Sequence, residues 1–231
     1  HKELNIPIGI IQTPVGGTTV EAWTSRTLLM SDKDFRPIVQ HYDSIVNSYG
    51  SDGYEKLYNR YVSSLAEYNQ LNAEQKKYID KPVEPMGRKN FHRPIGLSET
   101  MLNTVIPYTL KGFLFYQGES NTARGAQYRK LFPAMINEWR TAWGQGDIPF
   151  LFIPRFETKT RYWYELREAQ YLTSHHVKNT AMVVAFDQGN PKDIHPIVKD
   201  TVGWRLSQLA LGKVYGKKVV CQGPEFKKMT K

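Results

Sequence analysis

Four short apolar runs, with helical patterning between them, constrain the fold of this chain more than any other feature. The runs cover residues 6–11, 112–117, 149–154 and 180–185. Strands that alternate with helices in this way form a mostly parallel sheet covered on both faces. With 231 residues and 40% hydrophobic content, the chain is long enough for one domain with a large core. The sequence therefore predicts an α/β fold in a single domain.

Helical spacing of apolar residues follows each of the last three runs. The expected helices cover residues 127–143, 162–174 and 197–211, and Gly144 and Gly146 stop the first of them. Residues 24–92 differ, because they are rich in Tyr, Asn, Asp, Lys and Glu. We expect them to form a helical insertion beside the rim of the site, acting as cover for the sheet or as a wall or lid for the substrate.

Charge and composition exclude several classes of function. The net charge is +9, but the basic residues are scattered and no nucleic-acid-binding motif accompanies them, so we expect no nucleic-acid partner. The apolar runs are too short to span a bilayer. Cys221 is the single cysteine, which excludes an internal disulfide and a cysteine-based zinc site. His175 and His176 are adjacent on a helix, so their side chains diverge, and we expect no metal.

Polar and small residues follow the first two apolar runs. In an α/β sheet, ligands bind beyond the carboxyl ends of the strands. Gly16 and Gly17 permit close approach of the backbone, so that amides can face a developing negative charge, although a Gly-Gly pair is more often only a tight turn. No dinucleotide-binding or P-loop pattern is present.

The second polar segment contains Gln117, Glu119 and Asn121. Gln117 can donate two hydrogen bonds without carrying a charge, which suits an oxyanion hole. Glu119 is a candidate base or orienting group, and an internal hydrogen-bonding strut fits it equally well; Asn121 fits either role. Ser120 lacks the second glycine of a nucleophile elbow, so we do not assign it as a nucleophile.

His195 follows the fourth run, two positions after Asp193. A histidine on a loop at a helix entrance, near a carboxylate, is suited to general-base catalysis near neutral pH. We therefore expect three polar loops to meet on one rim of the sheet.

These segments together resemble the SGNH-hydrolase superfamily, and more closely its sialate O-acetylesterase-like carbohydrate esterases. Residues 6–23 resemble the block with the oxyanion-hole glycine, residues 111–121 resemble the third block, and residues 193–196 resemble the last block. Residues 166–170, which include Arg167, resemble a segment that supports the site. The resemblance implies a flavodoxin-like three-layer sandwich.

The resemblance also implies a serine-type hydrolysis of acetyl esters on sugars, without metal or organic cofactor. His195 would be the base, Asp193 the acid of the triad, and Gly16, Gly17 and Gln117 the oxyanion site. The expected substrate is 9-O-acetyl sialic acid. Acetylxylan-type esterase activity, a non-catalytic carbohydrate-binding protein and an unrelated flavodoxin-like signalling or nucleotide-binding domain remain as alternatives. By the same resemblance we expect a secreted or periplasmic protein; the oligomeric state is not predicted.

Two departures from the superfamily pattern stand out. No Gly-Asp-Ser or Gly-Gln-Ser segment occurs in residues 1–15, so we expect this chain to lack its nucleophilic serine and its first strand, to be incomplete at the N-terminus and to be inactive alone. Such a chain would have a gap in its sheet that is prone to aggregation. The position three residues before His195 is Lys192, and the nearby carboxylate is Asp193. Another group is therefore an alternative partner for the imidazole.

Overall fold

A computed structural model describes residues 1–154, 163–188, 198–225 and 228–229. Within these residues the sheet has three parallel strands: β1 (Phe113–Phe115), β2 (Phe150–Phe152) and β3 (Thr180–Met182). The strand order is β1-β2-β3, and Leu114, Leu151 and Ala181 are in register across it. The α/β fold with a parallel sheet is therefore confirmed.

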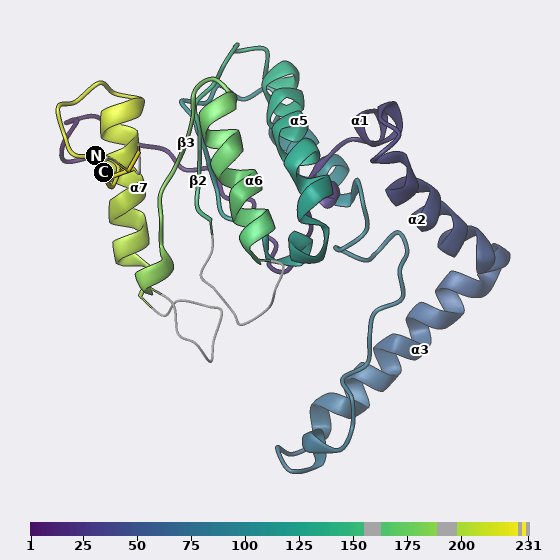
Figure 1. The fold of residues 1–231 in the computed structure, drawn as a ribbon. Coiled ribbons are helices and arrows are strands. Elements are labelled where there is room, and N and C mark those ends of the chain that lie inside the picture. Colours follow the sequence, from purple (N-terminus) through teal and green to yellow (C-terminus); the bar gives the residue numbers. More distant parts are fainter. Residues whose placement is uncertain (155–162, 189–197, 226–227, 230–231) are drawn as a thin grey trace.

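Helices cover both faces of this sheet. Figure 1 shows the strands between α7 (Asp200–Lys213) on one side and α5 (Gly125–Trp143) and α6 (Trp163–His176) on the other. The helices α5 and α6 pack on each other and connect successive strands, as parallel pairing requires. The Gly144 residue ends α5 in the left-handed conformation (φ 65°), as the sequence predicts.

Strand alternation divides the core into two parts. Aromatic side chains of β1 and β2 point toward α5, where the Phe150 ring lies 5.4 Å from Phe113 and 5.8 Å from Trp139, centroid to centroid. Leu151 and Ala181 point the other way and pack with Leu209 of α7. The larger cluster includes the apolar face of α5 and the aromatic side chains of β1 and β2, so α5 packs against this face of the sheet.

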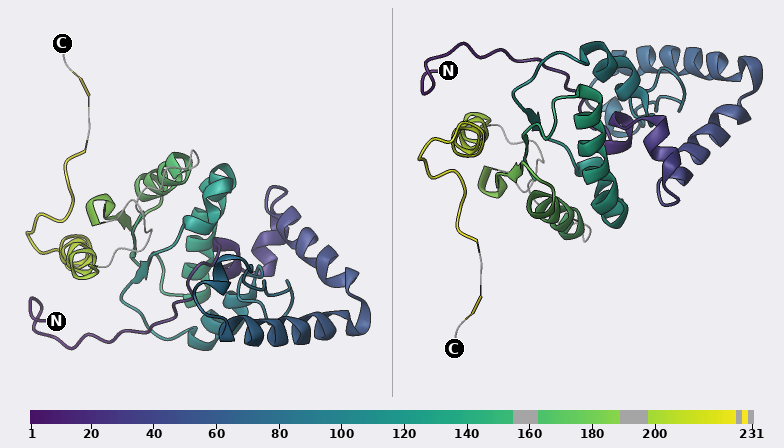
Figure 2. Two further views of the ribbon diagram at one scale, coloured as in Figure 1. Left: turned by 90° about the horizontal axis from the view of Figure 1, so that it is seen from below. Right: turned by 90° about the horizontal axis from the view of Figure 1, so that it is seen from above.

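The region between residues 24 and 92 is mainly helical. It contains α1 (Arg26–Ser31), α2 (Arg36–Ser48) and α3 (Gly50–Gln70). Ser25 caps α1 by accepting a hydrogen bond from the Leu28 amide at 3.1 Å, and α1 packs on α5. Figures 1 and 2 show α3 projecting away from the sheet, and this helix has no buried residue.

Short elements complete the described chain. They are the 3-10 helices η1 (Val20–Trp23), η2 (Gln75–Lys77), η4 (Glu119–Arg124) and η5 (Phe186–Gln188), the π-helical turn η3 (Ser98–Leu102) and α4 (Asn103–Val105). No helix among the described residues is long and apolar enough to cross a membrane. The assignment of residues 24–92 as an insertion within one domain stays a prediction.

The expectation of a strand over residues 6–11 is wrong. The segment forms no ladder, and the Ile10 side chain is 84% exposed. Alternating β-branched residues favour an extended backbone, but a strand also needs a neighbouring edge with which to exchange hydrogen bonds. Pro7 further removes one donor. The other three expected strands are confirmed, each shorter than predicted.

Candidate active site

Two loops meet beyond the carboxyl end of β1. One contains the turn at Gly16 and Gly17, and the other runs from Gln117 into η4. The Ser120 hydroxyl donates to the Gly17 carbonyl at 2.6 Å, and Gln117 Nε2 donates to the Thr18 carbonyl at 3.1 Å. The structure thus brings together two loops that lie about a hundred residues apart in sequence.

The sharp turn after β1 depends on Gly118. Its φ of 155° and ψ of −30° lie in a region that side-chain-bearing residues rarely adopt. A Cβ at this position would lie 3.0 Å from Leu166 Cδ2 and 3.2 Å from Gln170 Nε2. The loop is closed by the backbone N–H of Asn121, which donates to the Gly118 carbonyl at 2.9 Å. The turn therefore packs closely on α6.

Gln117 is buried and its hydrogen-bonding groups are engaged within the protein. Nε2 donates to the Thr18 carbonyl and, at 2.7 Å, to Asn121 Oδ1, while Oε1 accepts from the Tyr128 hydroxyl at 3.2 Å. Its backbone carbonyl accepts from Gln170 Nε2 at 3.1 Å. To donate to an oxyanion, Gln117 would have to release one of its two Nε2 bonds, so that role stays a prediction.

Asn121 connects the two loops from a buried position. Its Oδ1 accepts from the Val20 amide at 2.8 Å as well as from Gln117, and its Nδ2 donates to Glu21 Oε2 at 2.8 Å. Glu21 also pairs with Arg124. Glu21 is a site residue that the sequence did not predict, because a single carboxylate in an apolar stretch carries no local signal and its partner is 100 positions away.

The glycine turn is the more open of the two loops. Gly17 has φ +72°, and no described atom lies within 4 Å of the position that a Cβ on Gly16 would occupy. His92, which was not predicted as a site residue, places Cε1 at 3.4 Å from the corresponding position on Gly17. The exposed backbone of this turn is thus accessible to a substrate.

The remaining described candidates lie around these loops. Glu119 is half-buried in the first turn of η4. Arg167 lies on α6, with its guanidinium 4.8 Å from the Phe186 ring centroid. It lines a shallow pocket beyond the carboxyl ends of β2 and β3, together with Pro154, Glu168, Tyr171, Met182, Val184 and Phe186. Arg167 therefore sits at the same end of the sheet as Gln117.

His195 and Asp193 lie outside the described residues, within the stretch 189–197. The chain on either side of that stretch is tied together by Asp187 and Arg205. The Arg205 guanidinium donates to both Asp187 carboxylate oxygens, at 2.6 and 2.5 Å. These hydrogen bonds hold the pKa of Asp187 well below its usual value. The ion pair connects η5, just before the stretch, to α7, just after it.

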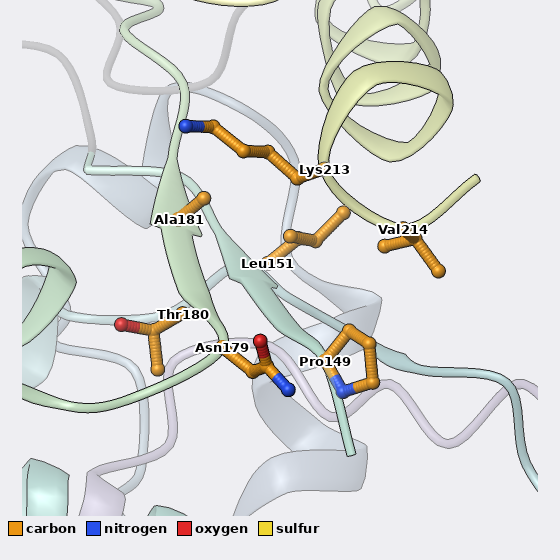
Figure 3. A pocket seen from close by; sticks show the side chains of 7 residues that line it. All are labelled: Pro149, Leu151, Asn179, Thr180, Ala181, Lys213 and Val214. Carbon is orange, nitrogen blue, oxygen red and sulfur yellow. The ribbon is translucent and has the colours of Figure 1, made fainter. Parts of the chain in front are cut away.

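A second cavity lies at the opposite end of the sheet. Figure 3 shows it between α7 and the starts of β2 and β3, with the Lys213 side chain reaching toward β3. Its volume is about 170 Å³. Because ligands of α/β sheets bind at the carboxyl ends of the strands, we place the candidate site at the other end. Among the described residues no group of three His, Cys, Asp or Glu side chains is placed to hold a metal ion.

An α/β fold with two polar loops joined beyond a parallel strand is a common setting for catalysis. The family model "Carbohydrate esterase, sialic acid-specific acetylesterase" matches residues 82–220, which is more than half of the 231-residue chain. The chain therefore belongs to this family of carbohydrate esterases, and the resemblance noted from the sequence is confirmed.

Individual relatives agree with this assignment. The chain is 28% identical to the sialate O-acetylesterase of Mus musculus, over 99% of this chain and 43% of the relative, and 26% identical to that of Homo sapiens, over 97% and 39%. A crystal structure of a carbohydrate acetylesterase from Xanthomonas citri matches with a TM-score of 0.60 and 28% identity, over 92% of this chain and 38% of that one. The chain spans less than half the length of each of these relatives.

Proposed function

We propose that the protein is a carbohydrate O-acetylesterase that hydrolyses acetyl esters on sugars by a serine mechanism, with 9-O-acetyl sialic acid as substrate. The observation that carries the proposal is the junction of the Gly16–Gly17 turn with the Gln117 loop, in a chain whose residues 82–220 match the family model of these esterases. The relatives named sialate O-acetylesterase support the choice of substrate.

The proposed reaction has two stages. His195 removes the proton of a nucleophilic serine, which we assign to no residue of this sequence, as the serine oxygen attacks the acetyl carbonyl. His195 then returns the proton to the sugar oxygen as the ester bond breaks. A water molecule, deprotonated by the same imidazole, attacks the acetyl-enzyme. Acetate leaves as the imidazole returns that proton to the serine oxygen. Asp193 would orient the imidazole.

Donors for the tetrahedral oxyanion come first from the glycine turn in this proposal. The backbone at Gly16 and Gly17 is exposed, whereas both Nε2 hydrogens of Gln117 are directed at protein acceptors. Each oxyanion donor would lower the barrier by about 2.7–4 kcal/mol. Gln117, Glu119 and Asn121 would fix the loop, with Gln117 joining the oxyanion site if substrate displaces one of its acceptors.

Acetylated polysaccharides such as acetylxylan are a second candidate substrate. The observation that favours them is the match to a bacterial protein described only as a carbohydrate acetylesterase. Since enzymes that deacetylate glycans for nutrition are commonly exported, we also propose a secreted or periplasmic location. Cell fractionation of the natural source would test that location, and an exclusively cytosolic protein would contradict it.

Acetate release from 9-O-acetyl sialic acid tests the proposal. The protein is expressed at its full natural length beside His195→Ala and, as a matched control, His176→Ala, an exposed histidine on α6. We expect release by the unchanged protein and the control, and a loss of about 10²-fold or more in the first variant. Activity on acetylxylan but not on 9-O-acetyl sialic acid would show that acetylated polysaccharide is the substrate. A folded protein inactive on both would contradict the esterase and favour carbohydrate binding.

A further inference from the structure

Glu21 is a buried carboxylate to which the proposed chemistry gives no role. It lies in η1 with 3% of its surface exposed. Oε2 accepts from Asn121 Nδ2 at 2.8 Å, and Oε1 accepts from the Arg124 guanidinium. Burying a carboxylate costs free energy even when it is paired, so hydrophobic residues at such a position are often no less stabilising. A carboxylate here therefore calls for a role other than stability.

The Glu21 carboxylate determines the orientation of the Asn121 side-chain amide. An ionised carboxylate only accepts hydrogen bonds, so the end of the amide that faces it must be the donor, Nδ2. The other side is then Oδ1, which accepts from the Val20 amide at 2.8 Å and from Gln117 Nε2 at 2.7 Å. If the amide were reversed, its NH₂ group would face these two donors and its oxygen would face the carboxylate.

We propose that Glu21 is a positioning residue for the esterase site, acting through Asn121. By fixing this amide it holds Val20, just after the glycine turn, in register with Gln117, just after β1. The inference rests on the proposed function, because the two loops held in register are those assigned to the oxyanion and the substrate.

The same contacts define a pair of substitutions whose effects should cancel. With Glu21→Gln, the introduced amide has one acceptor for two donors, Asn121 Nδ2 and Arg124, so one contact is lost. With Asn121→Asp, two carboxylates face each other. In the double variant the introduced glutamine accepts from Arg124 and donates to the introduced aspartate, whose other oxygen still accepts from Val20 and Gln117.

Steady-state kinetics on the full-length protein measures this coupling. Each single variant should lower kcat for acetate release by about 10- to 100-fold, with KM within about twofold, because a misplaced loop lowers transition-state stabilisation more than binding. The double variant should recover at least about tenfold over either single variant. Glu138→Gln is the matched control: this carboxylate accepts from the Ser25 amide at 3.0 Å, and among the described residues its hydrogen bonds go to neither loop, so kcat should not change.

Hydrogen exchange of the Val20 amide supplies a readout that does not depend on activity. Glu21→Gln should accelerate its exchange by about tenfold or more, and the double variant should restore protection. Unchanged exchange in Glu21→Gln, or a double variant no better than the single ones in kcat, would overturn the inference. An inactive but folded wild-type protein would instead refute the proposed function, and the exchange data would then decide alone whether Glu21 orients Asn121.

Discussion

At the scale of single residues, Gly118 is the position where backbone conformation and packing both exclude a side chain. We predict that Gly118→Ala lowers the free energy of unfolding by about 1–3 kcal/mol, because φ would remain near 155° with a Cβ 3.0 Å from Leu166 Cδ2. Gly16→Ala is the control, since no described atom lies within 4 Å of the added Cβ. It should change stability by less than about 0.5 kcal/mol. Urea unfolding measures both, and equal effects would refute the argument.

Tyr128 should make the stability of the folded protein depend on pH in the alkaline range. Burial raises the pKa of its hydroxyl well above the usual value, although the Gln170 side chain partly opposes the shift. Above about pH 10 the unfolded tyrosine loses its proton while the buried one keeps it, so the folded state binds more protons and stability falls as pH rises.

The variant Tyr128→Phe isolates this effect. At pH 7 it should be less stable by about 1–3 kcal/mol, because Gln117 Oε1 loses its donor. Above about pH 10 the gap should narrow by about 1.4 kcal/mol per pH unit, since only the unchanged protein retains the shifted group. Guanidinium unfolding at several pH values measures the gap. A gap independent of pH would contradict the assignment to Tyr128.

The positions of Gln117 and Asn121 illustrate what the sequence can predict of a site. An apolar run that ends in polar residues predicts which loop faces the ligand, because strand and loop are adjacent in the chain. The acceptors of Gln117 are harder to predict from the sequence. Thr18 lies 99 positions away, and a hydrogen bond between such distant loops depends on how the sheet and helices pack, which the local sequence does not specify. Glu21 was missed for the same reason.

At the scale of elements, α5 packs on α6, and α6 carries Gln170, whose side chain donates to the Gln117 carbonyl. Gly125 begins α5, and a Cβ there would lie 2.7 Å from Glu165 Cβ and 3.1 Å from the Leu166 amide nitrogen. Neither atom is the end of a flexible side chain. Gly125→Ala should therefore separate the helices and lower the free energy of unfolding, by about 1–3 kcal/mol.

Gly203 in α7 offers a matched control, for which the same substitution should raise the free energy of unfolding. No described atom outside its own helix lies within 4 Å of an added Cβ, so Gly203→Ala should stabilise the protein by up to about 1 kcal/mol through helix propensity. Thermal or urea unfolding of the two variants compares the effects directly. Stabilisation by both substitutions would show that α5 and α6 can separate without cost.

The elements themselves were predictable to different degrees. Residues 127–143 show apolar spacing strong enough to predict α5 to within two residues at its start. Residues 6–11 are equally apolar, yet they form no strand, because a strand depends on a neighbour that the local sequence does not specify. The sequence thus predicts helices better than strands here, since a helix satisfies its hydrogen bonds within itself.

At the scale of the whole molecule, the face of the sheet opposite α5 is covered unevenly. Leu114 and Leu151 are register partners on this face, but Leu151 is 3% exposed and Leu114 is 66% exposed. The helix α7 contacts β2 and β3, and the described residues place no strand on the free side of β1. An exposed apolar edge strand is prone to pair with another chain. This arrangement supports the expectation, made from the sequence, that an incompletely covered sheet makes this chain prone to aggregation.

We predict that Leu114→Lys reduces self-association of this 231-residue chain, because a charge on an edge strand opposes pairing between sheets. The substitution should leave stability within about 0.5 kcal/mol, since the side chain is already mostly in water. Val220→Lys is the control: Val220 is 88% exposed but lies outside the sheet, so the same added charge should not lower association to the same extent. Light scattering against concentration measures the difference. Equal reductions would assign the effect to net charge, and no reduction in either would show that the β1 edge does not drive association.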